Sequence, residues 1–289
     1  MLINSNLILN KALKEGYAIP AYNINNLEWT RFILEACNED KSPVILAVTE
    51  NAINYMGGYH VVYNLVTGLI KDLNINIPVC LHLDHGSTKE ACFKAIDAGF
   101  TSVMIDASDK ELEENIEITR EVKNYANKKN VSVEAELGSL SCEEDSVDKK
   151  VNLINPSDCS YFISATNIDS LAPAVGNKHG FYNTDDEIDY KLIGLVSKEA
   201  KIPLVLHGGS GLDNNKLSTA IFCGISKINI NTDLQLAWTL KVREYLEYNK
   251  ELYDPRKIIK SGETAIKKVV HEKNKILGCI NKIYCNCSS

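Results

Sequence analysis

Pro78-Val79-Cys80-Leu81-His82-Leu83-Asp84-His85-Gly86 begins like a buried strand but ends in imidazoles and a carboxylate. Burying a charged group such as Asp84 costs several kcal/mol unless it is paired or lies beside a cation. Two more His-Gly steps, His179-Gly180 and His207-Gly208, also follow apolar runs. Three imidazoles at the carboxyl ends of three predicted strands indicate a metal site on the rim of a barrel.

The remainder of the chain supports that fold, because short β-branched runs alternate with amphipathic helical stretches throughout. The predicted strands are Ala18–Tyr22, Val44–Val48, Val79–Leu83, Ser102–Ile105, Ser132–Leu137, Leu171–Val175, Leu204–Leu206 and Lys227–Ile230. Eight strand–helix units in 289 residues indicate an α/β protein with a (β/α)8 TIM barrel, whose catalytic groups lie on the loops after the strands.

A doubly wound open sheet is the rival fold. It normally has a glycine-rich dinucleotide turn after its first strand, and the sequence there, Ala21-Tyr22-Asn23-Ile24-Asn25-Asn26, contains no glycine. No linker rich in Gly, Pro or Ser interrupts the chain. We therefore expect one barrel domain over residues 1–289, with additional C-terminal helices that begin near Tyr253.

Composition excludes several classes of protein. The chain is 45% apolar and 24% charged, as soluble globular proteins are, and its net charge of −7 without a basic block argues against a nucleic-acid partner. No apolar run reaches the roughly 20 residues that span a membrane, and Met1–Lys14 does not resemble a signal peptide. A cytoplasmic location is expected, with the nine cysteines reduced.

The three imidazoles suit zinc. A catalytic zinc site usually takes three protein ligands and leaves one position open, and His85, His179 and His207 supply three nitrogens. Asp84 is either a further ligand or an acid–base group; neighbours on a regular strand rarely bind the same ion, which favours proton transfer. His82 shares the strand face of Asp84 and either supports the site or fills the barrel interior.

Further carboxylates lie on the fourth and fifth predicted strands. Glu134 and Glu136 share one face and need a cation or hydrogen-bond donors if that face is the barrel interior. Asp106 ends the fourth strand. The acidic run Glu143-Glu144-Asp145 lies within the polar stretch Ser141–Lys150, which is either a working loop or a solvated turn.

Two segments are candidates for binding phosphate. Gly208-Gly209-Ser210-Gly211 follows the seventh predicted strand, and Asn229-Ile230-Asn231-Thr232-Asp233 ends the eighth. Phosphate sites use backbone N–H groups at turns and helix starts, and TIM barrels commonly hold a phosphate after these two strands. The glycines could also merely turn the chain.

Together these residues resemble the class II, metal-dependent fructose-bisphosphate aldolases, in the shorter subclass that includes tagatose-bisphosphate aldolases. His82–Gly86 is similar to the family signature, in which the aspartate is the proton donor and the next histidine binds zinc. Ala174–Gly180 and Leu206–Gly211 match the other ligand motifs. Glu144 corresponds to the proposed proton-abstracting base, and Asp106 and Glu136 fall where the family can hold a second metal.

The resemblance implies a lyase of glycolysis and gluconeogenesis that reversibly cleaves fructose 1,6-bisphosphate into dihydroxyacetone phosphate and glyceraldehyde 3-phosphate. Zinc would stabilise the enediolate, with room for a second divalent ion and a monovalent cation. The implied substrate-binding residues are Asn23, Thr49, Gly180, Gly208, Gly209, Ser210, Asn229, Asn231, Thr232 and Arg256. Arg256 would act from a neighbouring subunit, in a homodimer or homotetramer.

Three alternatives stay open. A tagatose-bisphosphate aldolase differs at one stereocentre, and Tyr55-Met56-Gly57-Gly58 resembles the fructose branch more. A metal-dependent barrel hydrolase typically carries a His-x-His pair on its first strand, where this chain has Tyr22-Asn23. A non-catalytic phosphosugar-binding protein would not need both Asp84 and Glu144.

Overall fold

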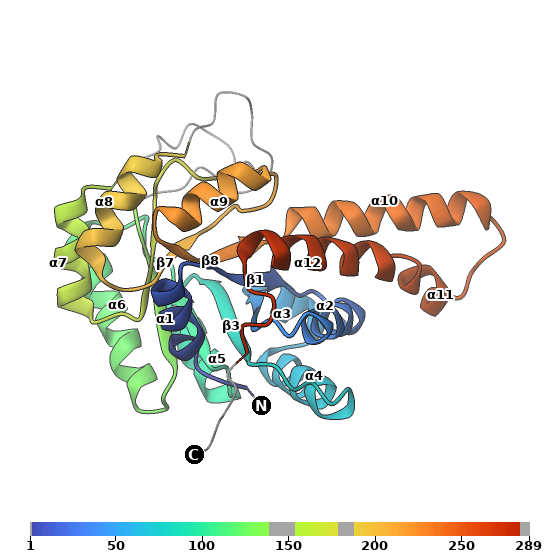
Figure 1. Ribbon diagram of the computed structural model, residues 1–289. Coiled ribbons are helices and arrows are strands. Elements are labelled where there is room, and N and C mark those ends of the chain that lie inside the picture. Colours follow the sequence, from blue (N-terminus) through green and yellow to red (C-terminus); the bar gives the residue numbers. More distant parts are fainter. Residues whose placement is uncertain (1, 139–153, 179–187, 284–289) are drawn as a thin grey trace, which may run out of the picture.

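The computed structural model describes residues 2–138, 154–178 and 188–283, and at its centre eight parallel strands form a closed barrel (Figure 1). The strands are β1 (Ile19–Asn23), β2 (Val44–Thr49), β3 (Val79–Gly86), β4 (Ser102–Ile105), β5 (Ser132–Leu137), β6 (Ser170–Pro173), β7 (Leu204–Leu206) and β8 (Ile225–Ile230). Each strand pairs with the next one in sequence, and β8 closes the barrel against β1. The predicted TIM barrel is therefore confirmed.

The predicted strand ends differ from the observed ones at two places that matter for the site. β3 continues past Leu83 to Gly86, and Asp84 lies in register with Thr49 of β2. β6 ends at Pro173, two residues before the predicted end at Val175. The chain turns there because the side-chain oxygen of Asn177 accepts a hydrogen bond from Val175 N at 3.1 Å, so that amide does not continue a strand ladder.

Helices follow the strands and form the outer layer (Figure 1). They are α1 (Ser5–Glu15), α2 (Leu27–Glu39), α3 (Glu50–Met56), α4 (Tyr59–Asp72), α5 (Lys89–Ala98), α6 (Leu112–Asn127), α7 (Pro156–Thr166), α8 (Tyr190–Ala200), α9 (Asn214–Phe222), α10 (Thr232–Tyr248), α11 (Pro255–Lys260) and α12 (Glu263–Leu277). Thr49, Thr88 and Asp213 cap α3, α5 and α9 with their side-chain oxygens. These caps satisfy N–H groups that helix starts leave unpaired, and they anchor loops at the carboxyl end of the barrel.

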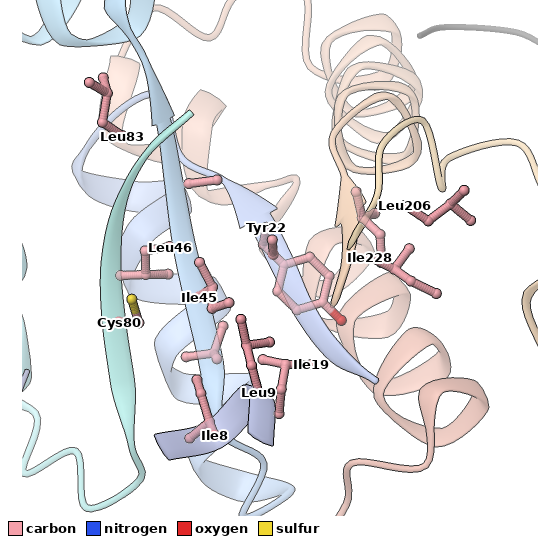
Figure 2. Packing of buried hydrophobic residues seen from close by; sticks show 14 of the residues in the cluster. Ile8, Leu9, Ile19, Tyr22, Ile45, Leu46, Cys80, Leu83, Leu206 and Ile228 are labelled. Carbon is pink, nitrogen blue, oxygen red and sulfur yellow. The ribbon is translucent and has the colours of Figure 1, made fainter. Parts of the chain in front are cut away.

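Helix α1 covers the opposite, amino end of the barrel. Its buried residues Ile8 and Leu9 lie near Ile19, where β1 begins (Figure 2). Tyr22, also in Figure 2, is fully buried, and its hydroxyl donates to Asn274 Oδ1 of α12 at 2.9 Å. The apolar layer between strands and helices thus extends from the closed amino end to the C-terminal helices.

The predicted C-terminal helices are present and extend away from the barrel. Helices α10 and α12 lie along each other, and α11 lies at their outer end (Figure 1). Trp238 of α10 donates from Nε1 to Ile259 O at 3.2 Å, which ties α10 to α11. Tyr248 and Tyr253, near this outer end, are almost fully exposed. Among the helices in the described parts of the chain, none has the length and apolar character needed to cross a membrane.

Candidate active site

The carboxyl end of β3 turns sharply at His85. This residue has a φ of 49°, in the left-handed region that non-glycine residues seldom adopt, and the pairing with β4 shifts register between Leu83 and Gly86. Gly86 is required at this turn because a Cβ atom there would lie 2.6 Å from Met104 O. Such strain persists only where the surroundings enforce it, and it frequently marks functional sites.

Asp84 of β3 is buried inside the barrel, beside side chains from β1 and β8. Its Oδ2 accepts a hydrogen bond from Asn23 Nδ2 and its Oδ1 accepts one from Asn229 Nδ2, both at 3.0 Å. Burial alone would raise the pKa of Asp84, but the nearby charges, those of His85 and His207 foremost, hold it well below its usual range. The structure therefore brings Asp84, Asn23 and Asn229 together, with Asp84 as an ionised acceptor.

His85 and His207 face each other across the barrel mouth. His85 Nε2 lies 3.0 Å from His207 Nδ1, and the two ring centroids are 4.6 Å apart. Potential ligand atoms of Asp84, His85 and His207 all lie within 4.8 Å of one another. Two of the three predicted histidine ligands are thus adjacent, although β3 and β7 are not neighbours in the barrel.

A carboxylate holds the remaining nitrogen of each of these two rings. His85 Nδ1 lies 2.8 Å from Asp106 Oδ2, and His207 Nε2 lies 3.0 Å from Glu134 Oε1. Ionised carboxylates only accept hydrogen bonds, so these two ring nitrogens carry the protons. Histidines that bind metals are usually oriented in this way, with the other nitrogen directed at the ion.

Glu136 and Asp106 form a second acidic group beside His85. Ligand atoms of His85, Asp106 and Glu136 lie within 4.8 Å of one another, and among the described residues the buried Glu136 Oε2 has no hydrogen-bond partner. Burial and then the charge of Asp106 raise the pKa of Glu136 to about 8. A buried oxygen without a donor is costly, so this carboxylate suits a cation.

The charge around His85 supports the same conclusion. Burial lowers the pKa of His85, but the hydrogen bond to Asp106 and the negative charges of Asp84 and Glu136 outweigh it and raise the pKa to about 9. The site therefore stabilises positive charge between the two imidazoles. A divalent cation with nitrogen and oxygen ligands fits these residues.

The loop after β7 packs tightly against β8. Gly209 N donates to Asn229 O at 3.0 Å, and a Cβ on Gly209 would lie 2.3 Å from Ile228 Cγ2. Ser210 Oγ accepts hydrogen bonds from Asn231 N at 3.1 Å and Asp233 N at 3.3 Å, at the start of α10. The loop after β7 and the end of β8 thus lie side by side at the carboxyl end of the barrel. They carry the predicted phosphate-binding residues Gly208, Gly209, Ser210, Asn229, Asn231 and Thr232.

Other predicted site residues lie apart from this cluster. Thr49 is at the rim, where its hydroxyl caps α3 by accepting from Ala52 N at 3.3 Å. Arg256 is on α11, at the far end of the helical extension, with its guanidinium exposed and bonded to Asp254 at 3.0 and 3.1 Å (Figure 1). Within one chain, Arg256 is therefore not at the barrel mouth. The predicted residues His179, Gly180 and Glu144 lie outside the described residues.

Sequence reasoning missed Lys227 and Asn177. Lys227 Nζ lies buried, 2.6 Å from Glu134 Oε2, and is the cation that the predicted interior face of Glu134 required. Asn177 Nδ2 donates to His207 O at 3.1 Å. The signal for Lys227 was present, because Lys227 and Asn229 alternate with apolar residues in Ser226-Lys227-Ile228-Asn229-Ile230. Nothing in the sequence pattern distinguished Asn177.

Comparison with known proteins places this site in context. Residues 3–282 match the family described as "Fructose-bisphosphate aldolase class-II". The chain is 49% identical to a fructose-bisphosphate aldolase of Geobacillus stearothermophilus over 97% of its own length and 98% of that protein's, and 46% identical to one of Staphylococcus epidermidis over 97% and 99%. Its fold resembles the crystal structure of the YdjI aldolase from Escherichia coli, with a TM-score of 0.86 and 31% identity, covering 98% of this chain and all of that one.

Proposed function

Because this chain belongs to the class-II fructose-bisphosphate aldolase family, we propose that it reversibly cleaves fructose 1,6-bisphosphate into dihydroxyacetone phosphate and glyceraldehyde 3-phosphate. The observation that carries the proposal is the cluster of Asp84, His85 and His207, whose potential ligand atoms lie within 4.8 Å of one another. In this cluster the proposed proton-transfer group, Asp84, lies next to two oriented imidazoles, and the loop after β7 that would bind phosphate follows His207 directly. We also propose that residues 1–289 form one domain built on the barrel.

His85, His179 and His207 would hold the catalytic zinc ion, and Asp106 and Glu136 would hold a second cation. When bound there, zinc would supply Lewis-acid chemistry at a substrate carbonyl oxygen. The protein orients the imidazoles so that His85 Nε2 and His207 Nδ1 face the proposed ion. Asp106 and Glu134 do this for His85 and His207 through hydrogen bonds of 2.8 and 3.0 Å.

Asp84 is the proposed proton-transfer residue at the C4 oxygen. In the cleavage direction, the ionised Asp84 takes the proton of the C4 hydroxyl as the C3–C4 bond breaks and the C4 carbonyl forms. In condensation it returns that proton to the aldehyde oxygen. Asn23 and Asn229 hold the carboxylate in place with one hydrogen bond to each oxygen. In cleavage the electron pair of the C3–C4 bond passes to C3, and Glu144 would deliver a proton to that carbon; in condensation Glu144 would remove that proton.

The two phosphates need separate sites. Backbone N–H groups around Gly180, Gly208–Ser210 and Asn229–Thr232 would bind one, at a place where a loop and a helix start meet. The N–H groups of Gly209 and Asn231 are not among these donors, because they already bond to Asn229 O and Ser210 Oγ. Asn23 and Thr49 would contact the sugar. Arg256 would bind the other phosphate from a neighbouring subunit of a homodimer or homotetramer. A guanidinium suits this role because it is always charged and binds phosphate with two parallel hydrogen bonds.

A coupled cleavage assay tests the proposal. We expect the purified protein to cleave fructose 1,6-bisphosphate faster than tagatose 1,6-bisphosphate, to lose activity in a strong chelator, and to regain it when zinc is added. Undiminished cleavage in the chelator would contradict the zinc site, and faster cleavage of tagatose 1,6-bisphosphate would reassign the substrate. Absence of cleavage of either sugar in the zinc-loaded protein would contradict the proposed reaction.

A further inference from the structure

Lys227 of β8 is buried inside the barrel, and it is linked through Glu134 to His207. Its side chain is 1% exposed, and Nζ lies 2.6 Å from Glu134 Oε2 and 3.3 Å from His82 Nε2. Lysine is rarely buried to this extent unless it is paired, because removing an ammonium group from water is costly. The position therefore requires an explanation beyond packing.

The hydrogen bonds around Lys227 define where the protons lie. A lysine ammonium group only donates, so Glu134 Oε2 and His82 Nε2 are both acceptors. His82 must then carry its proton on Nδ1, which lies 2.8 Å from Ser102 Oγ. Lys227 thus sets the tautomer of His82 and occupies one of the two oxygens of Glu134.

The other oxygen of Glu134 reaches the proposed metal site. Glu134 Oε1 lies 3.0 Å from His207 Nε2, so that nitrogen carries a proton, and His207 Nδ1 is directed towards His85 Nε2 at 3.0 Å. Glu134, His207 and Lys227 are all buried, with side chains exposed by 2%, 0% and 1%. Solvent therefore cannot replace a member of this chain of contacts, which continues through His82 to Ser102.

We propose that Lys227 is a positioning residue, which holds Glu134 against His207 and thereby fixes the ring nitrogen that His207 presents to the metal. This inference rests on the proposed function, since it assumes a metal ion between His85 and His207. Without the ammonium group, the Glu134 carboxylate is no longer held in this orientation, and the His207 ring can change tautomer or rotate. Lys227 Nζ contacts Glu134 and His82, so it would act on the metal through Glu134 and His207.

The first test is Lys227→Met, which keeps a side chain of similar length and removes the donors. We expect zinc affinity to fall about 10- to 100-fold, as it does when partners of metal-binding histidines are lost. The dissociation constant is measured on the full-length protein by competition with a chromophoric chelator. The absorption spectrum of the cobalt-substituted variant should also change, because it reports the ligand geometry directly.

Lys123→Met is the matched control. Lys123 is also a buried lysine in an ion pair, with Nζ 2.5 Å from Asp169 Oδ2, but it lies at the amino end of the barrel. This variant should lose stability and keep both the zinc affinity and the cobalt spectrum of the wild type. A general effect of removing a buried lysine would instead alter zinc binding in both variants, and that result would overturn the inference.

Two double variants decide the question if Lys227→Met does not fold. Lys227→Met with Glu134→Gln removes the ion pair but keeps a carbonyl oxygen that can accept from His207 Nε2, so zinc affinity should recover towards the wild-type value. Lys227→Met with Glu134→Leu lacks that acceptor and should stay weak. Equal zinc affinities in the two double variants, or wild-type affinity in Lys227→Met, would overturn the proposal. Failure of the wild-type protein itself to bind zinc would instead contradict the proposed function.

Discussion

Asp169 at the amino end of the barrel and Asp84 at the carboxyl end are both held by hydrogen bonds, but their partners differ in kind. Asp169 accepts from Lys123 Nζ at 2.5 Å, Val133 N at 2.7 Å and Asn6 Nδ2 at 2.7 Å. Asp84 accepts from two neutral side-chain amides, those of Asn23 and Asn229, both at 3.0 Å. Among the residues that the structure describes, a lysine and two amides donate to the first aspartate, whereas no ammonium or guanidinium group donates to the second.

The buried atoms without partners show the same contrast. In the described residues, Glu136 Oε2, Asn229 Oδ1 and Asn231 Oδ1 are buried without a hydrogen-bond partner at the carboxyl end, whereas Asn6 Oδ1 is the one such atom near Asp169. Buried polar atoms are normally satisfied, so a concentration of exceptions indicates groups kept for a ligand. We infer that polar groups at the amino end stabilise the fold, and that those at the carboxyl end carry function.

The largest effect is expected for Asp84→Ala. Loss of a general acid–base group should lower turnover by about 10²- to 10⁴-fold, with zinc still bound and the fold intact. Steady-state kinetics and metal analysis of the purified variant measure this. Asp72→Ala, at the exposed end of α4, is the control and should retain full activity. Loss of zinc from Asp84→Ala would make Asp84 a ligand, and near-normal turnover would contradict its catalytic role.

Lys123→Met should lower stability and leave activity unchanged, the reverse of Asp84→Ala. Removing one partner of a buried ion pair costs about 3 kcal/mol, near the low end of the usual range, because Asp169 keeps its other donors, Val133 N and Asn6. Chemical denaturation measures the change in the free energy of unfolding, and activity per folded molecule should be unchanged. A loss of turnover without a loss of stability would contradict the division between the two ends.

Gly209→Ala tests the loop after β7, which we propose binds phosphate. The new methyl group would meet Ile228 Cγ2 at 2.3 Å and Asn229 O at 2.8 Å, so the loop or β8 must shift. Overpacking of this kind costs roughly 1–3 kcal/mol, and KM for the bisphosphate should rise because the backbone donors move. Gly194→Ala in α8 is the control, because a Cβ there meets nothing within 4 Å. An unchanged KM in Gly209→Ala would argue against phosphate binding by this loop.

The smallest effect is expected for Ser5→Ala at the amino end. The Ser5 and Ser132 hydroxyls are 2.7 Å apart and join α1 to β5. Removing one such hydrogen bond should lower the free energy of unfolding by about 1 kcal/mol and leave kinetics unaffected. Thermal unfolding and the cleavage assay measure the two quantities. Altered kinetics would show that the amino end influences catalysis after all.

Local sequence pattern was sufficient to predict the barrel, and it placed candidate site residues at the carboxyl ends of β3, β7 and β8. Alternation of apolar runs with helical periodicity predicts eight units, and side-chain chemistry at the strand ends identifies Asp84, His85 and His207. The same patterns placed the end of β6 two residues late, because the turn depends on the side chain of Asn177. They also left open whether His82 supports the site or fills the interior.

The sequence by itself determined the eight-unit fold and which side chains reach the rim, because strand periodicity and residue chemistry are local properties. Only the tertiary structure decided which of them meet: the 3.0 Å approach of His85 and His207, which are separated by 122 positions, and the burial of Lys227 against Glu134. Barrel closure brings non-neighbouring strands face to face across the interior. The distance between two side chains that face each other across the barrel depends on how the whole sheet closes, so it cannot be predicted from a local stretch of sequence.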